Sequence, residues 1–273
     1  MIKVNLVADM DCNRCGRPAV IFQPYSGLSF CAHHLVEDIR KKGKRTVRLH
    51  SWIRPGDRIA FPCTGDPHSI ALTDFVRALV NGRKDISTCP IGPGKHEKIG
   101  SRSVSEQSPH PDTDPGFPAG LHGRGRSGGS NDPFRTKNDL EYSLCMAAKR
   151  NNATVLAMPY TLEDHAEWAL WKAVCGEIPG PERAGRERKT GIRIIRPFMH
   201  IPAPELTIYG ETVAGTCAPG AIRCDQSSQE SFIGRLLEEF SLGHPGARFA
   251  FVNIWDDITD LARQQGDTPP EER

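Results

Sequence analysis

Apolar residues in this chain fall into two alternating patterns. Short continuous apolar runs predict buried strands, whereas longer stretches carry apolar residues at the three- and four-residue spacing of a helix face. The predicted strands are 58–61, 86–88, 154–158 and 192–195, and the predicted helices include 35–49, 70–80, 137–151, 162–174 and 230–240. Because strands and helices alternate, we expect an α/β fold with a parallel, doubly wound sheet. In the last of these helices, Leu236, Leu237 and Phe240 are expected to form the buried face.

The first long strand leads into a polar loop and then into a helix. The strand at 57–62 is followed by the loop 63–69, which reads Cys-Thr-Gly-Asp-Pro-His-Ser, and by the helix 70–80. A strand, a loop and the first turn of a helix, in this order, have the geometry of a phosphate-binding turn. Cys63 ends this strand, and Cys89 is expected to end the next strand at the same edge of the sheet.

Four residues near the N-terminus have the spacing of a metal site. Cys12 and Cys15 are three positions apart, and Cys31 and His34 repeat that spacing sixteen residues later. Two ligands on a tight turn grip one face of a tetrahedral ion, and a second pair completes its shell. Three thiolates and one imidazole predict structural Zn2+ in a small zinc ribbon, with no open catalytic position. His33 is an alternative to His34, since a shift of one residue lies within the tolerance of a loop.

The helix after the predicted metal site is strongly basic. Its cations, six within nine residues, are Arg40, Lys41, Lys42, Lys44, Arg45 and Arg48. Such a run can track the phosphate backbone of RNA. A solvated helix face has the same composition, and the sequence does not decide between the two.

Composition and charge narrow the class of protein. The chain has 273 residues and a net charge of only +2, so nucleic-acid binding must come from local basic patches. It has no apolar run of about eighteen residues and no signal-peptide pattern, so we expect a cytoplasmic protein without membrane association. In a reducing compartment, nine cysteines favour metal ligands or reactive thiols over disulfides.

The order of these motifs resembles the PP-loop tRNA 2-thiolation enzymes, which are related to the tRNA-lysidine synthetases and the N-type ATP pyrophosphatases. The matching segments are Cys12–Val20, Cys31-x-x-His34, the basic helix, Pro55–Ile59, Ala153–Ala157, Leu162–Ala166, Arg193–Tyr209, Cys217-x-Pro219 and His244–Phe249. The resemblance implies an adenine-nucleotide-hydrolase-like sheet and tRNA as the partner. It also implies chemistry in which ATP adenylates a tRNA base before sulfur displaces AMP.

The departures from the family concern the nucleotide loop. Its Ser-Gly-Gly-Lys-Asp-Ser motif corresponds here to 63–68, so the resemblance assigns nucleotide contacts to Cys63, Thr64, Gly65 and, by a small shift of register, Ser69. The family's lysine is replaced by Asp66, which repels phosphate. The next residue is a proline, which lacks an amide N–H. Each change weakens nucleotide binding by about 1–3 kcal/mol, which argues against ordinary binding of ATP and Mg2+.

The resemblance also assigns catalytic candidates. Asp164 follows Glu163 where the family has an acidic pair, although acids also favour the first turn of any helix. The family's Cys-x-x-Cys falls at Pro133 and Thr136, so Cys217 alone remains of the cysteines that hold an iron–sulfur cluster in some members. One thiolate cannot hold a cluster, so we expect none. Cys217 is then either a sulfur carrier or a buried apolar side chain.

We expect three regions: a zinc ribbon and basic helix at 1–50, an α/β domain at 51–216 with a flexible insert at 92–134, and a helical extension at 217–273. The favoured function is a tRNA-binding module with impaired or lost ATP-dependent activity, acting as a homodimer or beside an active paralogue. One alternative is an active tRNA sulfurtransferase with an altered site. Another is a metal or persulfide site among Cys63, Cys89, Cys217 and Cys224.

Overall fold

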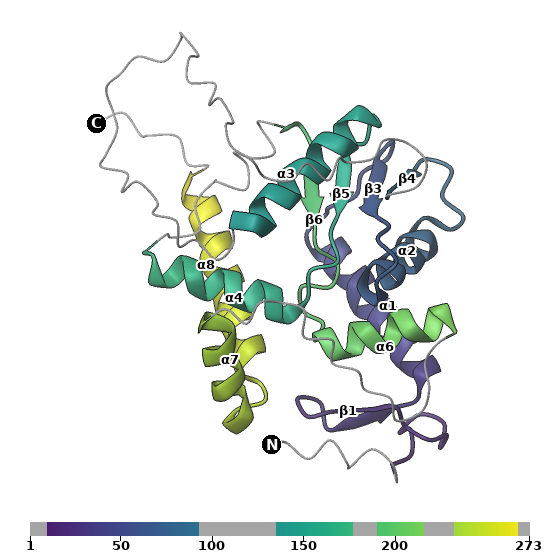
Figure 1. The fold of residues 1–273 in the computed structure, drawn as a ribbon, viewed down its shortest axis with the longest axis vertical. Helices are drawn as coiled ribbons and strands as arrows, with labels where there is room; N and C mark the ends of the chain where they lie inside the picture. Colours follow the sequence, from purple (N-terminus) through teal and green to yellow (C-terminus); the bar gives the residue numbers. More distant parts are fainter. Residues whose placement is uncertain (1–9, 93–134, 177–189, 216–231, 267–273) are drawn as a thin grey trace, which may run out of the picture.

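The computed structural model describes residues 10–92, 135–176, 190–215 and 232–266 (Figure 1). A parallel sheet of four strands runs in the order β4 (Ser87–Ile91), β3 (Arg58–Pro62), β5 (Val155–Ala157) and β6 (Arg193–Ile195). A separate antiparallel hairpin consists of β1 (Ile21–Gln23) and β2 (Leu28–Phe30). The helices are α1 (Ala32–Leu49), α2 (Pro67–Val80), α3 (Arg135–Arg150), α4 (Leu162–Val174), α6 (Ala203–Ala214), α7 (Phe232–Gly243) and α8 (Ala247–Gly266).

Both faces of the sheet are covered by helices. Along β3, Ile59 and Phe61 belong to the apolar cluster shared with α1, α2 and α6, whereas Ala60 belongs to a second cluster shared with α3. Alternate residues of a strand point to opposite faces, so this division shows that helices pack on each side. The predicted doubly wound parallel sheet is confirmed.

The N-terminal hairpin and α1 share their core with the sheet. The cluster that contains Phe30 and Leu35 also contains Phe75 of α2 and Tyr209 of α6. At Gly43, a side chain on α1 would meet the Phe75 ring at 2.8 Å, so the glycine allows α1 and α2 to approach closely. The predicted boundary at residue 50 therefore lies within one continuous apolar core, and the division into three regions stays a prediction.

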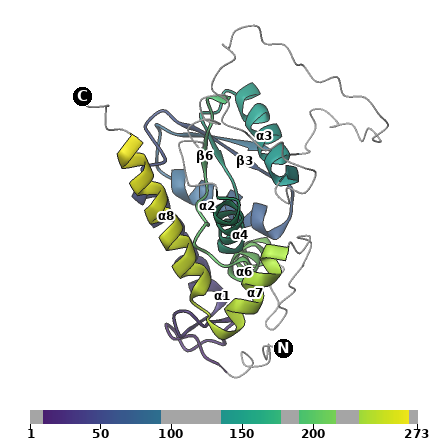
Figure 2. The ribbon, with the colours of Figure 1, turned by 90° about the vertical axis from the view of Figure 1, so that its left-hand side faces the viewer.

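The C-terminal helices do not bury the face that the sequence predicts. Leu237 packs against a small cluster formed by Leu162, Ala166 and Val252, which joins α7 and α8 to α4. Leu236 and Phe240, in contrast, are 48% and 58% exposed, so the prediction that they are buried is wrong. Helix α7 contacts α4 and also α8, which runs along one side of the molecule in Figure 2, and Leu236 and Phe240 are not part of the apolar cluster formed there.

Cys89 is also placed differently from the prediction. It lies within β4, paired with Ala60 of β3, and it is buried rather than exposed at the end of a strand. The predicted flexible insert lies outside the described residues except for Gly92. Among the helices of the described residues, none has the length and apolar character needed to cross a membrane.

Candidate metal centre and nucleotide loop

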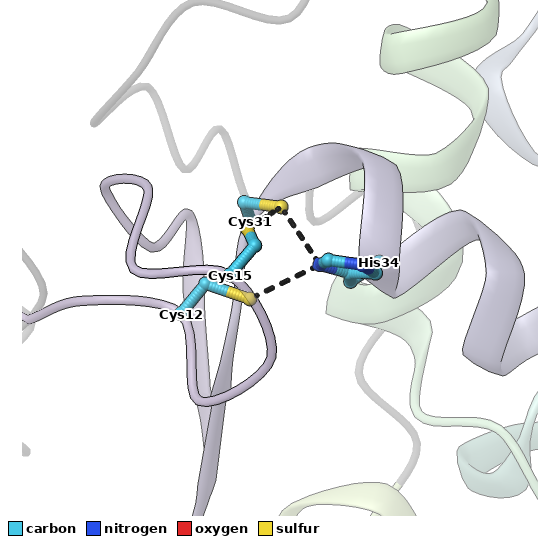
Figure 3. Close-up of side chains that lie close together, drawn as sticks. All are labelled: Cys12, Cys15, Cys31 and His34. Carbon is cyan, nitrogen blue, oxygen red and sulfur yellow. Dashed lines mark hydrogen bonds between the residues drawn. The ribbon is translucent and has the colours of Figure 1, made fainter.

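The segment 12–34, which we call the knuckle, brings the four predicted metal ligands together. Gly16 has φ +67°, and its N–H and that of Cys15 donate to the Cys12 carbonyl at 2.9 and 3.2 Å. This turn places two thiols beside each other, and the hairpin β1–β2 returns the chain to Cys31. His34 follows in the first turn of α1 (Figure 3).

The distances between these side chains suit one tetrahedral ion. The Nδ1 atom of His34 lies 3.4 Å from Cys12 Sγ and 3.5 Å from Cys31 Sγ, and the Sγ atoms of Cys15 and Cys31 are 3.7 Å apart. Ligands bonded at about 2.0–2.3 Å in a tetrahedron are separated by about 3.5–3.7 Å. His33 does not join them, because it is exposed and its Nε2 lies 3.3 Å from Glu37.

The surroundings of Cys12 favour its ionised form. Burial of the thiol opposes ionisation, but hydrogen bonds from the backbone of Cys31 and Arg14 and from the His34 side chain outweigh it. Together they lower the pKa of Cys12 to about 6. Since the thiolate is the form that binds metal, this site is prepared for a cation.

The knuckle is anchored on α6 through a buried carboxyl group. Glu205, only 2% exposed, accepts hydrogen bonds from Tyr25 Oη at 2.5 Å and Gln23 Nε2 at 3.0 Å. Lys42 of α1 donates to the same tyrosine oxygen at 3.0 Å and pairs with Asp38 at 2.7 Å. Burial raises the pKa of Glu205 to about 7, although Tyr25 and Lys42 act in the opposite direction.

The loop after β3 is closed by one of its own side chains. Asp66 is the N-cap of α2, and its Oδ1 accepts the N–H groups of His68 at 2.9 Å and Ser69 at 3.1 Å. It also accepts the Thr64 hydroxyl. In a phosphate-binding turn these amides face the ligand. Here a carboxylate of the chain itself takes that place. Burial opposes the ionised form of Asp66, but the hydrogen bonds from Thr64 and Ser69 lower its pKa.

The other residues of the loop also bond among themselves. Gly65, with φ +88°, donates its N–H to Ser69 Oγ at 3.1 Å, and Ser69 donates its hydroxyl to the Asp66 carbonyl at 3.0 Å. The Cys63 thiol lies 3.6 Å from the Thr73 hydroxyl. The four predicted nucleotide contacts are thus gathered at the carboxyl end of β3, beside the point where the strand order reverses.

Helix α6 packs directly on this loop. A side chain at Gly210 would come within 1.9 Å of the Pro67 carbonyl oxygen, so only glycine permits this approach. His68 Nε2 lies 3.1 Å from the Thr207 hydroxyl, which adds a polar contact between α2 and α6.

The two carboxylates at the start of α4, Glu163 and Asp164, also form hydrogen bonds and ion pairs within the protein. Asp164 forms a capping box with Thr161 and pairs with Lys137 of α3 at 2.8 Å. Burial opposes ionisation of Asp164, but Lys137 and Thr161 lower its pKa.

Glu163 accepts the Ala203 N–H at 2.8 Å and lies 3.2 Å from Arg248. Burial raises the pKa of Glu163, against the effect of Arg248. Both carboxylates therefore connect helices.

The other catalytic candidate, Cys217, lies outside the described residues. Cys224 and Pro133 also lie outside them, and Thr136 lies in the first turn of α3. Within the described residues, Cys63 and Cys89 belong to no group of three or more metal-ligating side chains. The alternative of a cysteine-rich metal site at the rim therefore has no support from this part of the chain.

The six cations of α1 divide into two kinds. Arg40 pairs with Asp74 at 2.6 Å and donates to Tyr209 Oη at 3.1 Å, and Lys42 is held by Asp38 and Tyr25. Lys41, Arg45 and Arg48 are exposed and Lys44 is half-buried. Sequence reasoning treated all six alike, because a count of charges does not show which of them face the core.

Sequence reasoning also missed two residues that organise the site. Asp66 was interpreted only as a charge that repels phosphate, although aspartate followed by proline is a common signature of an N-cap and the first helical position. Glu205 lies in a segment that resembles the family, but nothing local indicated its contacts, because its partners Gln23 and Tyr25 are some 180 residues away in the sequence.

Comparison with known proteins finds similarity to tRNA thiolation proteins in the N-terminal segment, in a short stretch of sequence and in the fold. Residues 11–36 match the model of the "2-thiouridine synthetase TtuA, N-terminal LIM domain". A segment of 70 residues is 31% identical to the tRNA-5-methyluridine(54) 2-sulfurtransferase of Thermus thermophilus, and it spans 26% of this chain and 22% of that protein. The fold is similar to that of the U34-tRNA thiolase NcsA from Methanococcus maripaludis, with a TM-score of 0.62 and 12% identity over 92% of this chain and 87% of the other.

The prediction about cofactors is corrected by this comparison. The NcsA structure contains a [4Fe-4S] cluster, so an iron–sulfur centre was wrongly excluded. Tetrahedral sulfur and nitrogen ligands suit iron–sulfur centres as well as zinc, so the ligand set did not justify naming zinc alone.

The N-terminal match contains the four clustered side chains, a short segment is similar to a tRNA sulfurtransferase, and the fold is similar to that of a tRNA thiolase. These similarities agree with the resemblance to the PP-loop tRNA thiolation family that the sequence motifs indicate.

Proposed function

We propose that this protein is a metal-containing, tRNA-binding member of the thiolation family in which ATP-dependent activation of the tRNA base is lost. The observation that carries this proposal is the bonding of Asp66 to the amides of His68 and Ser69. A phosphate at this helix start would have to displace a carboxylate already bonded there, and the two anions would repel each other.

Two further features support loss of the adenylation step. Pro67 offers no N–H at the first position of α2, and the lysine position of the family motif carries the acid itself. The acidic pair Glu163 and Asp164 is bound to Arg248, Lys137 and two helix starts. Freeing either carboxylate for magnesium or substrate would break contacts that join α4 to α3, α6 and α8.

The knuckle supports retention of a metal centre. Its four ligands are present and lie close together, with Cys12 inclined to ionise. The metal would hold the turn at Cys12–Gly16 and the start of α1 in one arrangement. Because the related thiolase carries a [4Fe-4S] cluster, iron and acid-labile sulfide are the first constituents to measure.

Activity and binding must be tested separately. The purified, metal-loaded protein is incubated with ATP, Mg2+ and an unmodified tRNA transcript, and AMP and pyrophosphate are measured together with tRNA binding. The proposal predicts binding of tRNA without tRNA-dependent release of AMP. Release of AMP would contradict the loss of adenylation and support an active sulfurtransferase. Absence of tRNA binding would contradict the proposed partner.

A further inference from the structure

We propose that four side chains of α1, Lys41, Lys44, Arg45 and Arg48, form the surface that contacts the phosphate backbone of RNA. We call them the basic stripe. This inference rests on the proposed function and deepens it, because it assigns RNA binding to one helix face and excludes the two other cations of that helix.

The basic stripe occupies one side of α1. An α-helix turns by about 100° per residue, so positions separated by three, four and seven residues fall within one arc of about 100°. The buried residues of α1 lie on the opposite side and are Leu35, Val36, Ile39, Gly43 and Val47. The stripe therefore points away from the core.

The stripe has no acidic partner in the part of the chain that the structure describes. Ion pairs within 4.0 Å involve Arg40 and Lys42, whose partners are Asp74 and Asp38, but none involves the four stripe residues. Within the stripe, Arg48 Nε donates to the Lys44 carbonyl at 3.3 Å. Glu37, one turn before Lys41, bounds the stripe and lies beside His33.

The length and charge of the stripe fit a nucleic-acid backbone. Seven residues of helix span about 10 Å, and a duplex of that length carries roughly six phosphate charges. The whole protein has a net charge of only +2, so a local excess of four positive charges stands out against its surroundings.

The same helix is unsuited to a membrane surface. A helix that lies on a bilayer inserts its apolar face, but the apolar face of α1 is buried against α2, α6 and the sheet. Its one large apolar side chain that is strongly exposed, Leu49 at 76%, stands alone at the end of the helix. RNA is therefore the partner that the surface favours over anionic lipid.

The test compares two variants that lose the same charge. In the stripe variant, Lys41, Lys44, Arg45 and Arg48 are all replaced by glutamine. The control variant makes the same change at four exposed cations elsewhere, Lys84, Lys149, Arg150 and Arg235. Affinity for an unmodified tRNA transcript is measured by fluorescence anisotropy between 50 and 300 mM KCl, and thermal unfolding checks that both variants fold.

The plot of log affinity against log salt concentration has a negative slope, and in the stripe variant this slope should be less negative by about 3, since each phosphate contact contributes roughly 0.7–0.9. Its affinity at 100 mM salt should fall by at least about tenfold, while the control keeps the parental slope. The single change Arg45→Glu should weaken binding in the same direction, which keeps the test valid if the quadruple variant unfolds.

Three results would overturn the proposal. If the parent binds tRNA and the stripe variant binds equally well, the basic stripe is not the RNA-binding surface, and the proposed tRNA binding stands. If the parent binds no tRNA, the proposed partner and the stripe fail together. Stripe-dependent binding to phosphatidylserine vesicles without binding to tRNA would make the surface a lipid contact.

Discussion

The metal knuckle and the loop after β3 differ in how their potential ligand-binding atoms are bonded within the protein. In the knuckle, three thiols and an imidazole face one point and leave their donor atoms directed at it. In the loop, the amides that would face a phosphate are bonded to Asp66. The ligand atoms of the knuckle contact one another and backbone N–H groups, which leaves their lone pairs for a cation, whereas the hydrogens of the loop amides are already donated to a carboxylate.

Helix α6 links the two regions. Near its start, Glu205 holds the knuckle through Gln23 and Tyr25. Two and five residues later in the sequence, Thr207 and Gly210 contact the loop. The following predictions concern these two regions and the helix between them.

The largest effect is expected from loss of a metal ligand. Cys31→Ser replaces a buried thiol between the hairpin and α1, so bound metal should fall toward zero. Because metal binding is coupled to folding, stability should fall by on the order of several kcal/mol. Metal analysis and thermal unfolding measure both effects. Cys175→Ser, an exposed thiol outside the cluster, is the matched control. Undiminished metal in the Cys31 variant would show that the knuckle is not the metal centre.

The contact between the knuckle and α6 should depend on pH. The pKa of Glu205 is raised to about 7 by burial, above its value of about 4.3 in an unfolded chain. The folded state binds this proton more tightly, so the stabilising contribution is complete below pH 4 and is lost as the pH rises to about 7. The free energy of unfolding should fall by on the order of 3 kcal/mol across that window relative to Glu205→Gln.

Denaturant unfolding at several pH values measures this difference. Ionisation of the metal ligands affects the parent and the Glu205 variant alike, so it cancels from the difference between them. The exposed Glu239→Gln serves as a control and should follow the parent. Parallel pH profiles for the parent and the Glu205 variant would contradict the role of this carboxyl group.

A somewhat smaller effect is expected where α6 meets the loop. Gly210→Ala places a Cβ atom 1.9 Å from the Pro67 carbonyl oxygen, so α6 must shift. Overpacking of this kind costs about 1–3 kcal/mol, measured by urea unfolding. Gly243→Ala, which meets nothing within 4 Å, should be neutral or stabilising. Equal stability of the Gly210 variant and the parent would mean that the helices are not in close contact.

The smallest effect on the free energy of unfolding is expected at Asp66, the N-cap of α2. Asp66→Ala removes the acceptor for His68 and Ser69 and should lower the free energy of unfolding by about 1 kcal/mol. Asp66→Asn keeps an oxygen acceptor and should retain most of that stability. If alanine is tolerated without loss, the amides of the loop are not held by this side chain.

Local sequence patterns predicted most of the fold. The helix at 162–174 has the predicted bounds, and the alternation of strands and helices gave the doubly wound sheet. The predicted strand at 86–88 proved to run from Ser87 to Ile91, so Cys89 is internal to it. The three-residue spacing within each pair brought out the four knuckle residues, and the hairpin β1–β2 brings the two pairs together.

The contacts of the site were less predictable because they are long-range. The partners of Glu205, Arg40 and Asp164 are distant in sequence, and no local spacing shows that their charges are neutralised. The same reason explains the error at Phe240, since helical periodicity shows an apolar face but not whether another element covers it.

Titration calorimetry with ATP measures whether Asp66 closes the loop against nucleotide. The metal-loaded protein is titrated with and without Mg2+ and tRNA, and Gly65→Asp serves as a variant whose loop carries a second acid. No binding heat is expected under any condition, because the amides of the loop are bonded to Asp66. Micromolar binding by the parent that is abolished in the Gly65 variant would show that the loop holds ATP and would rule out this role of Asp66.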